Sequence, residues 1–320
     1  MYKLYSLLSL IRFRNLLITA LIQICIKFYL INAYLNNSAL SVVDFNIYLI
    51  ALISIVAGGY IINDIYDTEI DKINRPKTRI IEREISKKHA TSIYYLLNII
   101  GLISGFYVSY QIGKIWYSII FIFFAFSLWK YSSHYKGSFL TGNIHVAFLT
   151  SLSIINLILF DLMPLGIKTQ DGSKIISYII LFYAVFAFFI TLIREIIKDI
   201  EDIKGDKRIG LNTLAINYGI TKTKSITALL TTIPIGGIAY FQYFQYSVLS
   251  STFSVRLSYW GVNTIAVLYT SLVQIMLIIL LVKINMSSKG SDFHSTSKIC
   301  KIIMLIGILS LPLFYFLHIQ

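Results

Sequence analysis

The chain has little of what a disulfide-bonded or soluble protein needs. Its 320 residues include two cysteines and four prolines, and only 13% of them are charged. Cys25 and Cys300 both lie in apolar runs far apart in the sequence, which excludes a disulfide framework and a zinc-binding spacing and predicts two core residues. Soluble domains carry about 25% charged residues. A hydrophobic content of 57% with a mean hydropathy of +0.74 therefore indicates a membrane protein.

Long apolar runs give the number of membrane crossings. A hydrocarbon core of about 30 Å needs roughly 20 apolar residues per helical crossing. Nine such runs lie near 16–34, 45–63, 91–110, 115–130, 140–160, 176–196, 226–246, 259–282 and 299–318. They do not alternate strictly between polar and apolar residues, so they favour helices over the strands of a barrel. We expect an all-α, polytopic membrane protein with about nine transmembrane helices.

The net charge of +13 is arranged for a membrane and not for nucleic acid. Of the 28 lysines and arginines, 23 lie in the N-terminal segment or after the second, fourth, sixth and eighth runs. By the positive-inside rule, these segments are predicted to be cytoplasmic. The first 14 residues show no signal-peptide cleavage pattern and are expected to form a retained interfacial helix. We expect an integral membrane protein, in the inner membrane if the source is a bacterium.

The acidic residues gather on the same predicted side as the basic ones. Eleven of the 15 lie in two stretches, 64–90 and 194–224. Membrane topology does not explain this concentration, and ionisable groups at membrane helix ends are costly enough that function is the expected reason for them. The two stretches are therefore the candidate site.

Each stretch places three aspartates at positions i, i+3 and i+7. The two triplets are Asp64, Asp67, Asp71 and Asp199, Asp202, Asp206. On a continuous helix each triplet would share one face over about two turns. Carboxylate oxygens are ligands that Mg²⁺ prefers, and Mg²⁺ usually shares its shell with water and substrate phosphates. We therefore expect a Mg²⁺-bridged polyanion, held also by basic neighbours. These neighbours are Arg75, Lys77, Arg79, Arg194, Lys198, Lys204, Lys207 and Arg208.

The spacing of the two stretches suggests an internal repeat. Each follows an even-numbered run, and four runs separate them. Asn15 opens the first run and Asn143 opens the fifth. This pattern predicts two related four-helix halves, 1–138 and 139–283, followed by a ninth helix, with a site between the repeats.

The ordered pair of motifs resembles the UbiA-type intramembrane prenyltransferase superfamily. NDIYDTEIDKINRP at 63–76 is similar to its first aspartate-rich motif, and REIIKDIEDIKGDKRIGLNTL at 194–214 is similar to its second. The resemblance covers nearly the whole chain and implies a single domain over 1–320 with helices around a central cavity. It implies that both motifs bind Mg²⁺ and a prenyl diphosphate, with Asn63 beside the six aspartates.

The resemblance also implies roles for single residues. A tyrosine and a lysine after the fourth run assist diphosphate departure in that family, and here Tyr131 with Lys136 match them. The spacing leaves Tyr135 as an alternative to Tyr131. Asn15 and Asn143 are expected to line the substrate pocket. The residues expected to carry the chemistry are Asp67, Asp71, Tyr131, Lys136 and Asp202.

The expected reaction is Mg²⁺-dependent transfer of a polyprenyl group from a polyprenyl diphosphate to a lipophilic acceptor. The opening IRFRNLLITALIQI most resembles members of the superfamily that use a prenylglycerol phosphate. Aromatic acceptors, such as 4-hydroxybenzoate, a naphthoate or a tetrapyrrole, stay open at this point, as do chain length and oligomeric state. A membrane transporter is the alternative from another class, but it predicts acids within the spans and not at one rim.

Overall fold

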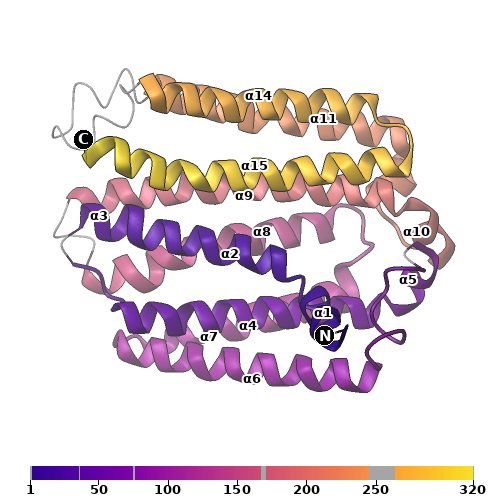
Figure 1. Cartoon of the computed structure of the whole chain (residues 1–320), viewed down its shortest axis with the longest axis horizontal. Helices are drawn as coiled ribbons and strands as arrows, with labels where there is room; N and C mark the ends of the chain where they lie inside the picture. The colour runs from indigo at the N-terminus through magenta and orange to yellow at the C-terminus, as the bar shows by residue number, and fades with distance from the viewer. Residues whose placement is uncertain (1, 36, 75, 167–170, 245–263, 320) are drawn as a thin grey trace.

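The computed structural model describes residues 2–35, 37–74, 76–166, 171–244 and 264–319 (Figure 1). In these ranges nine helices are long and apolar enough to cross a membrane. The described residues contain no strand beyond an isolated bridge between Ile81 and Ile85. The all-α, polytopic prediction is confirmed. The predicted run 259–282 begins outside the described residues, and the helix there is described from Thr264 onward.

The nine spans are built from the long elements of the chain. They are α2 (Phe13–Ile26) with η1 (Lys27–Ile31) and α3 (Asn32–Tyr34), α4 (Val42–Tyr66), α6 (Lys87–Gln111), η2 (Ile115–Tyr117) with α7 (Ser118–Lys130) and η3 (Tyr131–Tyr135), α8 (Thr141–Leu157) with η4 (Ile158–Leu162) and η5 (Met163–Leu165), α9 (Asp171–Glu201), α11 (Leu214–Phe244), α14 (Thr264–Met286) and α15 (Gly290–Ile319). The remaining short helices are α1 (Tyr2–Leu10), α5 (Thr68–Asn74) and α10 (Ile203–Ile209).

The long helices lie side by side, and the two short helices that carry the third aspartate of each triplet meet at one end of the bundle. Figure 1 shows α5 and α10 together at the right, whereas α3 lies at the opposite end. We call the α5–α10 end the motif end. Both acid-rich stretches therefore converge in space although they lie more than a hundred residues apart in the sequence.

Side-chain caps fix the start of two of the long helices. The Ser41 hydroxyl accepts a hydrogen bond from the backbone N–H of Asp44 at 3.1 Å, where α4 begins. The Ser86 hydroxyl does the same for His89 at 3.3 Å, where α6 begins. Each cap satisfies an N–H that has no partner inside the helix. The apolar runs therefore become helices with defined ends.

Small residues let α6 approach its neighbours closely. A side chain at Gly101 would lie 3.1 Å from the backbone oxygen of Ala51 in α4, and one at Gly105 would overlap the ring of Phe121 in α7. Membrane helices lack a strong hydrophobic drive to associate, so close backbone approach and van der Waals packing hold them together. The glycine spacing of four residues places both contacts on one side of α6.

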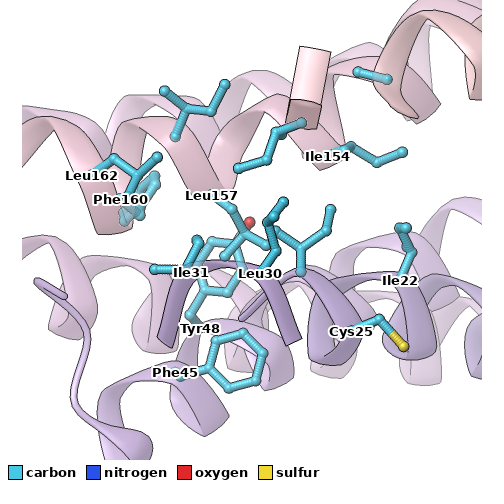
Figure 2. Close-up of a cluster of buried hydrophobic side chains, with 14 of the residues drawn as sticks. Ile22, Cys25, Leu30, Ile31, Phe45, Tyr48, Ile154, Leu157, Phe160 and Leu162 are labelled. Carbon is cyan, nitrogen blue, oxygen red and sulfur yellow. The ribbon is translucent and has the colours of Figure 1, made fainter. Parts of the chain in front are cut away.

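The largest buried cluster consists mainly of isoleucine and leucine, and it also contains a group of packed aromatic rings (Figure 2). Tyr48 of α4 lies at its centre, with its ring centroid 5.4 Å from that of Phe160 and 6.1 Å from that of Phe121. Cys25 lies in the same cluster, while Cys300 packs in a second cluster; both are buried and unbridged. The prediction that the cysteines are core residues is confirmed.

A buried ion pair joins the extensions of α2 and α8 away from the motif end. The Lys27 ammonium lies 2.7 Å from the Asp161 carboxylate, and both side chains are fully buried. Lys27 also donates to the Leu40 carbonyl at 2.7 Å, and the Leu40 N–H donates to Asp161 at 2.8 Å. Such a pair is tolerated in the interior only when its remaining hydrogen-bonding groups are satisfied, as they are here.

Candidate active site

A cavity of about 250 Å³ lies inside the bundle at the motif end. Residues of α2, α4, α5, α8, α9, α10 and α15 line it. From α4 it takes Asn63 and Asp67 near the helix end, and also Val56, about two turns earlier. Phe124 and Leu149 add further apolar surface. The cavity therefore has a polar mouth at the triplets and an apolar part that extends into the bundle.

The two aspartate triplets lie at helix junctions. The first junction breaks α4 from α5 at Asp67, which has φ −83° and ψ 1°, and the second breaks α9 from α10 at Asp202, with φ −91° and ψ 3°. The prediction that each triplet lies on one continuous helix is therefore wrong. At both junctions the third aspartate donates its backbone N–H to the middle one, Asp71 to Asp67 at 2.8 Å and Asp206 to Asp202 at 3.2 Å. Each bond spans four residues, as in an α-helix, so it ties the backbone of the third aspartate to that of the middle one across the break.

One asparagine joins the two junctions. The Asn74 side chain donates to the Asp202 carbonyl at 3.2 Å and accepts from the Gly205 N–H at 3.0 Å. A Cβ atom at Gly205 would overlap this side chain. Asn74 therefore holds the second junction against the first. Its side chain leaves room only for glycine at position 205.

The first triplet is held by cations of the protein. Asp64 pairs with Arg12 at 2.7 Å. The buried Asp67 carboxylate accepts from the Asn63 amide at 2.8 Å and forms an ion pair with Lys136. These contacts compensate the charge of two carboxylates that the membrane end of a helix would otherwise disfavour.

The second triplet is held differently. The Asp199 carboxylate accepts from the Asn143 amide at 2.8 Å. The nearby cations contact Glu195, which lies one turn earlier on α9: Arg194 at 2.5 Å and Lys198 at 3.2 Å. The buried Asp206 lines the cavity beside Asp202.

Tyr131 and Lys136 reach the cavity from η3 and the residue after it. Tyr131 lines the cavity, and its ring stacks on His145 with centroids 6.3 Å apart and planes at 4°. Tyr135 packs against the same His145 at 5.3 Å but does not line the cavity, so the geometry favours Tyr131. Burial, together with Arg12 and Lys198, lowers the pKa of Lys136 to about 8. Lys136 is therefore a cation that holds its proton less tightly than an ordinary lysine.

The two asparagines enter the cavity in the same way. Arg12, before α2, and Leu140, before α8, both have φ 50°, and the third residue after each is the cavity-lining asparagine. A positive φ is uncommon for residues other than glycine, so its occurrence at both Arg12 and Leu140 shows that the two helices begin with the same backbone conformation. Asn143 contacts Asp199, and Asn15 accepts from the Lys301 ammonium at 2.9 Å.

The structure brings together most of the predicted site residues. Those that line the cavity are Asn15, Asn63, Asp67, Asp71, Tyr131, Lys136, Asn143, Arg194, Lys198, Asp199, Asp202 and Asp206. Those that lie outside its lining are Asp64, Lys77, Arg79, Lys204 and Lys207. Arg75 is outside the described residues. Asp64 nevertheless touches the site through Arg12.

Sequence reasoning missed several residues of the cavity wall. They are Arg12, Asn74, Thr191, Glu195 and Lys301. Lys301 carried a usable signal, because a charge inside an apolar run is costly and marks a functional position. Asn74 and Thr191 carried none, because an uncharged polar residue beside a motif is common.

The donor set suits Mg²⁺. In the described ranges no three Asp, Glu, His or Cys side chains converge as a complete metal site. Six carboxylates nevertheless line the cavity, five of them from the two triplets. Mg²⁺ is commonly held by one or two carboxylates while water and substrate phosphates fill its other positions. The residues therefore fit a cation whose binding is completed by a phosphorylated substrate.

Comparisons with known proteins agree with this arrangement. The UbiA prenyltransferase family matches residues 24–289. The chain is 35% identical to the digeranylgeranylglyceryl phosphate synthase of Sulfurisphaera tokodaii over 187 residues, which are 58% of this chain and 62% of that one. It is 31% identical to the synthase of the same name from Methanosphaera stadtmanae over 255 residues, 79% of this chain and 80% of that one. The match thus spans under two thirds of the first relative.

A solved structure shares the fold. It is a UbiA homologue from Archaeoglobus fulgidus bound to GPP and Mg²⁺, which is 16% identical, with a TM-score of 0.57 over 96% of this chain and 99% of that one. The likeness concerns the architecture, and it extends over all the described spans. Since the family matches most of the chain, and a relative above 30% identity is covered over four fifths of its length, this integral membrane protein belongs to the UbiA prenyltransferase family.

Proposed function

We propose that the chain catalyses Mg²⁺-dependent transfer of a polyprenyl group from a polyprenyl diphosphate to a prenylglycerol phosphate. The observation that carries this proposal is the shape of the cavity, where two aspartate junctions form a polar mouth and apolar side chains line the inner part. A prenyl diphosphate has the matching form, a polyanionic head on an apolar tail. The solved homologue bound to GPP and Mg²⁺ supports this choice of donor.

The carboxylates of both junctions would hold the metal. Asp67 and Asp71 face the cavity from the first junction, and Asp199, Asp202 and Asp206 face it from the second. When bound, Mg²⁺ stabilises negative charge on the oxygens of the departing diphosphate as a Lewis acid. Asn63 and Asn143 orient Asp67 and Asp199 through hydrogen bonds of 2.8 Å each, so the carboxylates are positioned before substrate arrives.

Lys136 and Tyr131 act on the two sides of the bond that breaks. The Lys136 ammonium donates to diphosphate oxygens and stabilises the charge that develops when the allylic C1–O bond breaks. The Tyr131 ring lines the same cavity, where its face can stabilise a cation-like carbon by about 0.5–2 kcal/mol. The apolar walls keep water from this carbon until the acceptor hydroxyl attacks.

The acceptor is inferred from the relatives. Two proteins that share 31–35% of aligned residues with the chain are named digeranylgeranylglyceryl phosphate synthases. Their name describes a product with a glyceryl phosphate head. The cavity lining includes the cations Arg12, Arg194 and Lys301, which suit the phosphate of such an acceptor better than a neutral aromatic ring.

We also propose an orientation and an internal repeat. The motif end and the N-terminus would lie on the cytoplasmic side, which the excess of lysine and arginine in these segments supports. The paired junctions at Asp67 and Asp202, and the paired φ 50° caps before α2 and α8, support two related halves, 1–138 and 139–283. The cavity lies between these halves, as in other membrane proteins built from repeats.

The test is a transfer assay with purified protein in nanodiscs. Radiolabelled geranylgeranyl diphosphate and Mg²⁺ are incubated with geranylgeranylglyceryl phosphate, 4-hydroxybenzoate or dihydroxynaphthoate. We expect label in the glyceryl phosphate, lost with EDTA and in the double variant Asp67→Ala, Asp202→Ala. Glu69→Gln is the matched control, because this carboxylate lies in the same motif but is exposed and pairs with Lys72.

Two outcomes would contradict the proposal. If label enters only an aromatic acceptor, the chain is a prenyltransferase but the proposed glyceryl phosphate acceptor is wrong. An absence of both transfer and Mg²⁺-dependent binding, with donors of several chain lengths, would remove the reaction itself and favour a transporter.

A further inference from the structure

The wall of the cavity formed by α2, α9 and α15 is basic and lies beside the aspartate junctions. On α9 the lining residues Thr191, Arg194 and Lys198 recur at helical spacing, so they share one face. Lys301 faces the same cavity from α15, which packs against both α9 and α2. We call Arg194, Lys198 and Lys301 the basic wall. Arg194 pairs with Glu195 and Lys301 donates to Asn15, so these two contacts are made with residues other than the aspartates of the junctions.

The charges on this wall do not balance. Arg194 and Lys198 share one carboxylate, Glu195. Lys301 donates to the neutral side chain of Asn15 at 2.9 Å, and among the described residues no carboxylate forms an ion pair with it. Lys301 therefore carries a charge that no ion pair among the described residues balances. A phosphate monoester carries about −1.5 to −2 at neutral pH.

Two buried polar groups on the wall also lack partners. The Arg194 Nε atom and the Thr191 hydroxyl make no hydrogen bond with the described residues, although both are buried. Thr191 is only 5% exposed, and it lines the cavity. A buried donor without a partner costs about 1–3 kcal/mol, so a ligand that accepts hydrogen bonds here would recover that cost.

Lys301 is also placed where a charge is expensive. It is the twelfth residue of α15, inside a span from Gly290 to Leu317. An ionisable residue within a membrane span usually has a function, because burying its charge there is costly. Lys301 fits this expectation, since it lines the cavity. Lys298, one turn earlier on the same helix, is exposed and does not line the cavity.

We propose that the basic wall, with Lys301 as its central cation, binds the phosphate monoester of the acceptor lipid. The inference rests on the proposed function and adds the place where the acceptor head is recognised. The diphosphate of the donor lies at the aspartate junctions with Lys136, so the two anionic heads occupy neighbouring but different parts of one cavity. Separate sites keep two negative substrates apart while their reacting carbon and hydroxyl meet between them.

The experiment measures acceptor and donor binding separately, on the full chain in nanodiscs. The acceptors are geranylgeranylglyceryl phosphate and geranylgeranylglycerol, which lacks the phosphate. The variant is Lys301→Met and its matched control is Lys298→Met, with Lys301→Arg as the rescue. Because one charge-assisted hydrogen bond contributes about 1.5–3 kcal/mol, we expect Lys301→Met to weaken binding of the phosphorylated acceptor at least tenfold.

The affinities for the other two ligands should stay unchanged. In Lys301→Met we expect less than a twofold change in the Kd of the phosphate-free acceptor and of Mg²⁺-bound geranylgeranyl diphosphate. Lys298→Met should match the wild type, and Lys301→Arg should recover most of the loss. An equal loss for both acceptors, or a weakened donor Kd, would overturn the inference. If Lys301→Met does not fold, Lys301→Gln is measured in its place.

Two further arms separate the causes of failure. Inorganic phosphate at the same concentration should not protect the protein against thermal unfolding as the phosphorylated lipid does, and equal protection would mean a general anion site. Wild-type protein that transfers no label to the glyceryl phosphate contradicts the proposed function. Wild-type transfer that survives in Lys301→Met with unchanged acceptor affinity contradicts only the acceptor site.

Discussion

The junction between α4 and α5 and the junction between α9 and α10 share a backbone but have different partners. Both break a long helix at the middle aspartate, at φ −83° and φ −91°. At the first junction, cations contact the triplet itself, through Lys136 on Asp67 and Arg12 on Asp64. At the second, an amide holds Asp199.

This difference indicates a division of labour. At the first junction a metal ion has to compete with the ion pair between Lys136 and Asp67, whereas at Asp199 it competes with a hydrogen bond from a neutral amide. We therefore expect the second junction to contribute more to metal affinity. The first couples metal, diphosphate and Lys136, so it should contribute more to bond breaking.

The largest expected effect comes from removing one charge at each junction. Asp67→Asn and Asp199→Asn should each lower the transfer rate by about a hundredfold or more, the loss typical of an electrostatic catalytic group. The Mg²⁺ concentration for half-maximal donor binding should rise more in Asp199→Asn. Titration of Mg²⁺ against labelled donor measures it, with Glu69→Gln as control. Equal shifts would show that the two junctions are equivalent.

Removing Lys136 should give the next largest effect. Lys136→Met should lower kcat by about tenfold to a hundredfold, because one charge-assisted contact to the leaving diphosphate is lost. Lys136→Arg should retain more activity, since it keeps the cation. Single-turnover transfer measures the step directly. Lys130→Met, a cation of the same region outside the cavity lining, is the control, and a loss of similar size there would argue against the assignment.

Breaking the link between the junctions should have a moderate effect. Asn74→Ala leaves the Asp202 carbonyl and the Gly205 N–H without their partner, which costs about 1–3 kcal/mol of stability. Gly205→Ala should also destabilise, because the added Cβ overlaps Asn74. Thermal unfolding in detergent, followed with and without donor, measures both. An unchanged melting temperature in Asn74→Ala would show that the junctions hold their positions independently.

The smallest effect is expected at the basic residues of α10 that face away from the cavity. Lys204 and Lys207 are exposed and do not line it. The double variant Lys204→Met, Lys207→Met should change the transfer rate and donor Kd by less than twofold. A larger loss, measured at constant ionic strength, would mean that α10 moves toward the substrate when it binds.

The spans and the two motifs were predictable because each depends on local composition. Apolar runs of sufficient length determine the helices, and aspartates at fixed spacing mark the site. The break in each helix was not predictable from that spacing, since i, i+3 and i+7 also fit a continuous helix. The link between the two breaks was equally hidden, because Asn74 contacts residues 128 and 131 positions away.

The basic wall was equally hidden in the sequence. Lys301 and Asn15 meet across 286 positions, a contact that depends on how α15 packs against α2. The predicted cations Lys77, Arg79, Lys204 and Lys207 were near the motifs in sequence, but they lie outside the cavity lining. Proximity in sequence therefore identified the acids better than the bases, because the acids lie in the junctions and the bases reach the cavity from other helices.

The Lys27–Asp161 pair has a consequence for the relation between the two halves. In the proposed repeat, the offset that aligns Asn15 with Asn143 sets Lys27 against Ile155 and Asp161 against Ala33. The bridge is therefore made once, although a symmetric assembly of identical subunits forms every such contact twice. A homodimer of the first half would bury Lys27 without Asp161, and a homodimer of the second half would bury Asp161 without Lys27. In the proposed division each half supplies one ion of the pair, so neither half could satisfy its own buried charge without the other.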